Sequence, residues 1–69
     1  MRAIIVDDEL NARLALKGIL EENFPEINVV AENADVPSAV KSIHSFHPEL
    51  VFLDIAMPGY SGLELLKFF

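Results

Sequence analysis

Three short apolar runs alternate with two segments of helical periodicity, and this alternation limits the possible fold more than any other feature of the chain. The runs are Arg2–Val6, Ile27–Ala31 and Leu50–Ile55. Each is short and largely apolar, which is typical of strands buried on both faces of a sheet. Strands separated by single helices predict β-α-β units, in which right-handed crossovers join the strands of a parallel sheet. We therefore expect an α/β fold.

The two intervening segments carry apolar residues at the spacing of helices that bury one face. The first is Leu10–Glu22, and its expected buried positions are Ala12, Ala15, Leu16, Ile19 and Leu20. The second should begin at Asp35, a good N-cap residue, and end before Pro48, because the residue preceding a proline disfavours helix. Its expected buried positions are Val36, Ala39, Val40, Ile43 and Phe46 or His47.

A turn and a further helix are expected after the third strand. Pro58 and Gly59 predict the turn, and Ser61 with Glu64 three residues later forms a capping box. The sequence stops within the apolar stripe of that helix. We therefore expect residues 1–69 to be the N-terminal portion of one doubly wound domain, without its later strands or an output domain.

The composition excludes several classes of protein. No apolar stretch approaches the ~20 residues of a membrane-spanning helix, and the apolar run before Asp7 is too short for a secretory signal. The absence of cysteine excludes disulfides and thiolate metal sites. With 5 Lys and Arg against 11 Asp and Glu, the net charge of −6 disfavours nucleic-acid binding. We expect a cytoplasmic domain that contacts neither membrane nor nucleic acid through this segment.

Acidic residues lie at the carboxyl ends of the first and the third expected strands. Asp7 and Asp8 come directly after Val6, and Asp54 comes directly after Leu53. Ligands of open parallel sheets bind at the carboxyl ends of the strands, so the three acids converge if these strands are neighbours. Two carboxylates 4 Å apart repel by about 4 kcal/mol at an effective dielectric of about 20. Mg²⁺ would remove that repulsion and prefers such oxygen ligands, whereas any one of these acids alone would be interpreted as a solvated turn residue.

The strings IIVDDE, FLDIAMPG and SGLELL together resemble the receiver domain of two-component response regulators. The resemblance covers the whole chain, and the segment Asn11–Leu16 is most similar to the LytTR-linked branch of the family. It implies a flavodoxin-like doubly wound parallel sheet in which the first strand lies between the second and the third. Such a module is a signalling protein and not itself an enzyme.

The same resemblance implies the role of each acid. Asp54 corresponds to the phosphoacceptor, which takes a phosphoryl group from a histidine kinase and so alters the face that meets an output domain or downstream partner. Asp7 and Asp8 correspond to the Mg²⁺-binding pair, with Asp54 and the backbone carbonyl of Ala56 as further ligands. The family's hydroxyl residue and lysine follow later strands, so neither Ser61 nor Lys67 is expected to take those roles.

Two other functions compete with this interpretation. A Mg²⁺-dependent phosphatase of the haloacid dehalogenase type also uses a strand-end Asp, but it needs a second Asp two residues later, where Glu9 and Ala56 stand. A pure interaction module would instead use the third strand as an open sheet edge, and we expect self-association through that edge. His44 and His47 are interpreted as partners of a helix dipole rather than as metal ligands.

Overall fold

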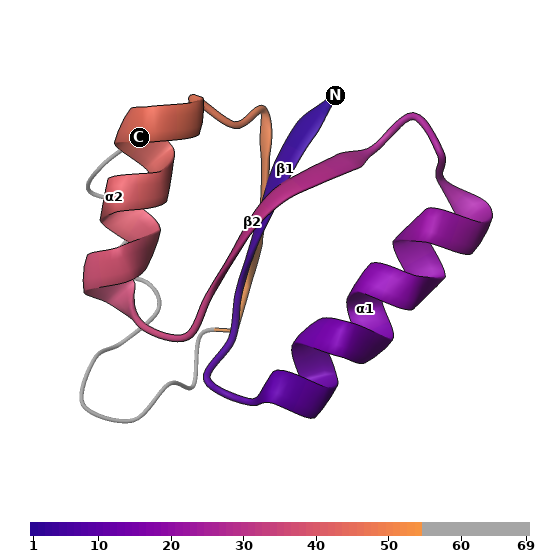
Figure 1. Cartoon of the computed structure of the whole chain (residues 1–69), viewed down its shortest axis with the longest axis horizontal. Coiled ribbons are helices and arrows are strands. Elements are labelled where there is room, and N and C mark those ends of the chain that lie inside the picture. Colours follow the sequence, from indigo (N-terminus) through magenta and orange to yellow (C-terminus); the bar gives the residue numbers. More distant parts are fainter. Residues whose placement is uncertain (55–69) are drawn as a thin grey trace.

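A three-stranded sheet lies between two helices in the computed structural model, which describes residues 1–54 (Figure 1). In chain order the elements are β1 (Arg2–Val6), α1 (Leu10–Asn23), β2 (Asn28–Asn33), α2 (Val36–Phe46) and β3 (Leu50–Leu53). The helices lie on opposite sides of the sheet. The expected third helix, with its capping box at Ser61 and Glu64, lies outside the described residues.

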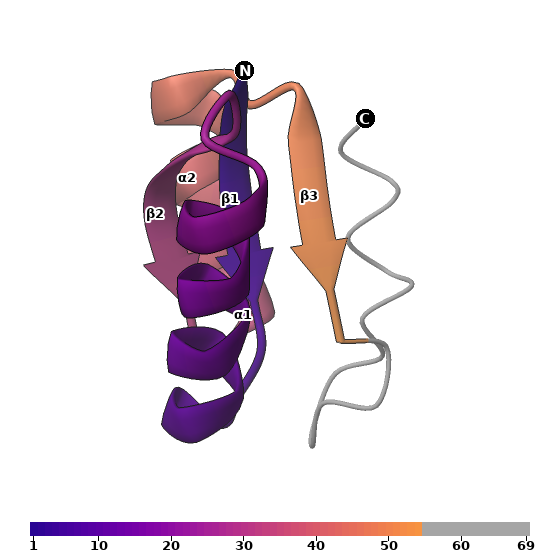
Figure 2. The same ribbon diagram turned by 90° about the vertical axis from the view of Figure 1, so that its right-hand side faces the viewer.

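The sheet is parallel, and its strand order is β2-β1-β3, as the sequence predicted. Figure 2 shows β1 between its two neighbours, with all three strands pointing the same way. The register of β1 against β2 shifts between Ala3 and Ile4, whose partners are Val29 and Ala31, so Val30 is an extra residue on β2. Because a register change of one residue exchanges the two faces of a strand, this shift decides which face of the sheet the rest of β2 presents to each helix.

The hydrophobic core lies between the sheet and α2. Its buried members are Ile4, Val6, Val36, Ala39 and Ile43, and five partly buried side chains pack against them: Val30, Ala31, Val40, Val51 and Leu53. The predicted stripe of α2 is therefore confirmed up to Ile43. It is wrong at Phe46, which is 42% exposed, and at His47. His47 has a left-handed backbone (φ 46°) and begins the turn toward β3, so the last helical turn lies beyond the core.

The stripe of α1 that faces the sheet is narrower than the sequence predicted. Leu20 is buried and Ala12 and Leu16 are half-buried, but Ala15 is exposed and Ile19 is 54% exposed. Of the predicted apolar positions, only those four residues apart along α1 are buried or half-buried. Neither helix within residues 1–54 has the length and apolar composition of a membrane span.

Asp35 caps the N-terminus of α2, as predicted. Its carboxylate accepts a hydrogen bond of 2.8 Å from the backbone N–H of Ser38. That bond lowers the pKa of Asp35, and the Ser38 hydroxyl and the charge of Lys41 lower it further. The ionised cap therefore favours the folded state.

Asp35→Asn should make the stability of the protein less dependent on pH in the acid range. The pKa of Asp35 is lower in the folded state, so its stabilising contribution is complete above the unfolded pKa of about 3.9 and is lost as the pH falls through the folded value. Asparagine also caps helices but does not titrate. Urea unfolding of both proteins, measured from neutral pH to about pH 3, should show their stabilities converging, and a constant difference would contradict this account.

Candidate metal centre

Three carboxylates meet at the carboxyl edge of the sheet. Val6 and Leu53 are partners in the ladder of β1 and β3, so Asp7 and Asp54 leave these strands side by side. The backbone N–H of Asp54 donates to the carbonyl of Val6 (2.9 Å), which continues the ladder beyond the end of β3. One carboxylate oxygen from each of Asp7, Asp8 and Asp54 lies within 4.8 Å of the others. The predicted convergence of the three acids is thus present in the structure.

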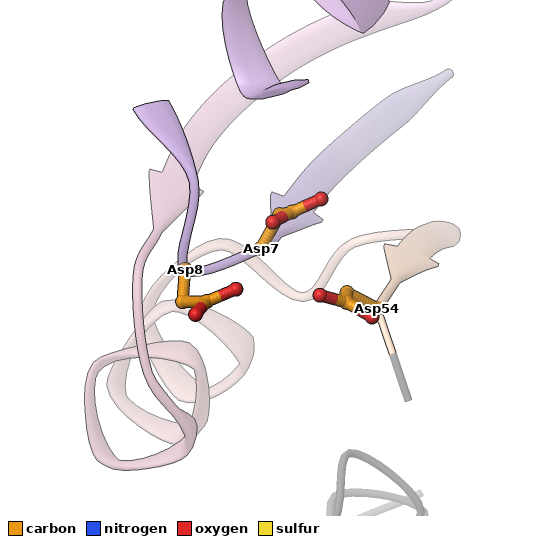
Figure 3. A group of neighbouring side chains, drawn as sticks. All are labelled: Asp7, Asp8 and Asp54. Atoms are coloured by element: carbon orange, nitrogen blue, oxygen red, sulfur yellow. The ribbon is translucent and has the colours of Figure 1, made fainter. Parts of the chain in front are cut away.

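The three side chains differ in their surroundings. Asp7 and Asp54 are half-buried, while Asp8 is exposed. Figure 3 shows the carboxylates of Asp8 and Asp54 turned toward one another, with Asp7 beside them. Asp7 also accepts a hydrogen bond from the backbone N–H of Glu9 (2.9 Å), which fixes its carboxylate at the start of α1.

The chemistry of this donor set fits Mg²⁺. All three groups are hard carboxylate oxygens, and the exposure of Asp8 leaves one side of the cluster open to water. Mg²⁺ binds through a few carboxylates while it keeps several waters, whereas Ca²⁺ takes six to eight oxygen ligands. When bound, the ion would offset the mutual repulsion of the acids and the charge of a phosphoryl group. Ala56, the expected fourth ligand, lies outside the described residues.

A cleft of about 360 Å³ opens beside the acids, between α1 and the sheet. Asp7 and Asp54 line it together with apolar side chains that include Ile5, Leu16 and Phe52. The two half-buried carboxylates therefore border a space with an apolar floor. Within residues 1–54 these acids, together with Asp8, form the one group of ligating side chains close enough to share a metal ion, and neither His44 nor His47 belongs to it.

The structure adds a residue that the sequence did not indicate. The guanidinium of Arg13 donates a hydrogen bond of 2.6 Å to the backbone carbonyl of Asp7, six residues earlier. The sequence offers one signal for this contact. It is an arginine in the first turn of the helix that follows a strand-end acid. The same guanidinium lies 3.5 Å from the carboxylate of Glu32 on β2.

The fold and the acids together define a flavodoxin-like α/β domain with an acidic cluster at the carboxyl ends of its central strand and a neighbouring strand. The family model of the response regulator receiver domain matches residues 3–69, and the chain belongs to this family. The family resemblance predicted from the sequence is thereby confirmed, together with the fold that it implied.

Individual relatives agree with this assignment. The chain is 41% identical over 66 residues to the transcriptional regulatory protein BtsR of Salmonella typhi, an alignment that covers 96% of this chain and 27% of the relative. Its structure is similar to the response regulator domain of Thermotoga maritima CheB, with a TM-score of 0.88 and 34% identity over 99% of this chain and 50% of that one.

A second solved structure is RcsB from Salmonella enterica serovar Typhimurium bound to promoter rprA in the presence of the phosphomimetic BeF3⁻. Its TM-score is 0.84 with 27% identity, and the match covers 99% of this chain and 57% of that one. The chain therefore spans between about a quarter and about half of these three proteins. These relatives do not support the LytTR-linked branch that the sequence suggested.

Proposed function

We propose that the chain accepts a phosphoryl group on Asp54 from a histidine kinase, with Mg²⁺ held by Asp7, Asp8 and Asp54. The observation that carries the proposal is the convergence of these three carboxylates within 4.8 Å in a chain of the receiver family. The backbone carbonyl of Ala56 completes the proposed ligand set on the family resemblance alone.

Asp54 is proposed as the acceptor because of its position as well as its resemblance to the family motif. It lies at the end of β3 and borders the cleft, and its backbone N–H donates a hydrogen bond to the carbonyl of Val6. A carboxylate oxygen of Asp54 forms the new bond to phosphorus while the bond between phosphorus and the kinase histidine breaks, and the electron pair leaves on the imidazole. The side chain thus acts as a nucleophile in acyl phosphate formation.

We further propose that residues 1–69 form the N-terminal portion of a cytoplasmic receiver domain, which acts as a switch rather than as an enzyme. A relative named as a transcriptional regulator and a similar structure bound to a promoter support an output that acts on transcription. The Asn11–Leu16 segment is the one feature that favours the LytTR-linked branch of the family. This segment itself is not expected to contact nucleic acid, given its net charge of −6.

A second candidate function is self-association through β3. Within residues 1–54 this strand pairs with β1 alone, so its other edge offers backbone groups to another strand. Self-association is compatible with phosphoryl acceptance, because the edge runs along Leu50–Leu53 and the acids lie beyond the ends of β1 and β3.

The phosphoacceptor proposal is tested with a small-molecule phosphodonor such as acetyl phosphate. The purified protein should incorporate one phosphoryl group as a hydroxylamine-sensitive acyl phosphate that peptide mapping assigns to Asp54. Incorporation should require Mg²⁺ and stop on addition of a chelator. Phosphate on a serine or histidine, or incorporation that is indifferent to the chelator, would refute the proposal.

A further inference from the structure

Arg13 is the most enclosed of the three charged side chains that connect α1 to β2. Its side chain is 14% exposed, against 39% for Lys17, and both cations face Glu32, which is 25% exposed. Arg13 Nε lies 3.5 Å from one oxygen of Glu32, and Lys17 Nζ lies 3.4 Å from the other. The two cations thus share one carboxylate but differ in what else they contact.

Only Arg13 reaches the acidic site, through its Nη1 bond of 2.6 Å to the carbonyl oxygen of Asp7. That carbonyl belongs to the peptide that joins Asp7 to Asp8. On the other side of Asp7, its N–H donates to the carbonyl of Asn33 (2.9 Å). Its carboxylate accepts from the N–H of Glu9. Asp7 is therefore fixed at its N–H, its carbonyl and its side chain.

These contacts also hold the backbone on both sides of Asp8, which is itself exposed. The peptide before Asp8 is fixed by Arg13, and the residue after it is tied back to the Asp7 carboxylate. Without the bond from Arg13, the peptide between Asp7 and Asp8 would lose the side-chain contact that holds its carbonyl.

Glu32 is placed to hold the guanidinium in this position. It precedes Asn33, whose side chain turns to the opposite face of the sheet and accepts a buried hydrogen bond of 2.8 Å from Ser42 on α2. The planar guanidinium donates from Nη1 to the carbonyl of Asp7, while its Nε makes no hydrogen bond among the described residues and faces the carboxylate of Glu32 as an ion pair at 3.5 Å. A lysine ammonium has no such planar group.

We propose that Arg13 is a positioning residue, which fixes the peptide between Asp7 and Asp8 so that a carboxylate oxygen of each lies within 4.8 Å of one from Asp54. Glu32 orients Arg13 in turn. The inference rests on the proposed function in that it takes these acids as the Mg²⁺ ligands. Residues that orient metal ligands typically change metal affinity by about 10- to 100-fold when they are substituted.

The test compares Arg13→Gln with Lys17→Gln by calorimetric titration with Mg²⁺. Both substitutions remove one positive charge beside Glu32, and charge alone would make either variant bind the cation slightly more tightly. Loss of positioning acts in the opposite direction, so Arg13→Gln should bind Mg²⁺ about tenfold more weakly, while Lys17→Gln should bind it at least as well as the wild type. Equal or tighter binding by Arg13→Gln would overturn the inference.

A second readout does not involve the metal. Hydrogen exchange of the Glu9 amide, which donates to Asp7, should accelerate in Arg13→Gln and remain unchanged in Lys17→Gln. If Arg13→Gln fails to fold, Arg13→Lys carries the test, because it keeps the charge and the aliphatic stem but not the planar guanidinium. Weakened Mg²⁺ binding by that variant supports the inference, and wild-type affinity overturns it. A wild-type protein that binds no Mg²⁺ would instead refute the proposed metal site.

Discussion

Replacing Asp54 by asparagine is expected to abolish phosphoryl incorporation and to weaken Mg²⁺ binding by about tenfold, equivalent to about 1.4 kcal/mol. The amide keeps the shape of the side chain but has no anionic oxygen to attack phosphorus. It also removes one of three negative charges whose oxygens lie within 4.8 Å of one another. Mass spectrometry after incubation with acetyl phosphate measures the first effect, and calorimetric titration measures the second.

Asp8→Asn is the matched control for that substitution. It removes one carboxylate from the same cluster by the same chemical change but leaves the proposed nucleophile in place. Mg²⁺ binding should weaken to a similar extent, while phosphoryl incorporation should still reach completion at saturating Mg²⁺. Incorporation by Asp54→Asn would show that another residue is the acceptor. Wild-type Mg²⁺ affinity in both variants would show that these carboxylates do not form the metal site.

Most of the fold was predictable because its signals are local. The apolar run of β1 and the cap at Asp35 gave element bounds that the structure reproduces. The second strand was misplaced, since it was expected at Ile27–Ala31 but runs from Asn28 to Asn33. Its last two residues are polar, and an apolar pattern cannot identify them as strand. These two residues belong to the strand because they pair with β1, where Val6 is the partner of Asn33.

The candidate site was predictable to the extent that it follows from topology. Parallel neighbouring strands end at the same edge of a sheet, so acids directly after two such strands must approach one another. The contact of Arg13 with Asp7 and Glu32 has no comparable sequence signal. The contact depends on the rotation of α1 about its axis. It also depends on the register shift at Ala3 and Ile4, which helps set the face of β2 on which Glu32 lies. The same rotation leaves Ile19 exposed.

Ile4→Ala is expected to lower the free energy of unfolding by about 2–5 kcal/mol, the usual range when a buried isoleucine is truncated to alanine. Ile4 is fully buried on the central strand and contacts the core between the sheet and α2. A small domain has a total stability of only about 5–15 kcal/mol, so this loss is a large share. Urea unfolding followed by circular dichroism measures it.

Ile19→Ala provides the matched control, because it is the same substitution at a position that is 54% exposed on α1. Its cost should stay within about 0.5 kcal/mol, as is usual for surface substitutions. Equal losses in the two variants would contradict the described packing. Mg²⁺ at about 100 times its Kd should stabilise both variants by the same increment, about 2.7 kcal/mol, because neither side chain belongs to the acidic cluster. A smaller increment in Ile4→Ala would mean that the core on the α2 side also shapes the carboxylate site.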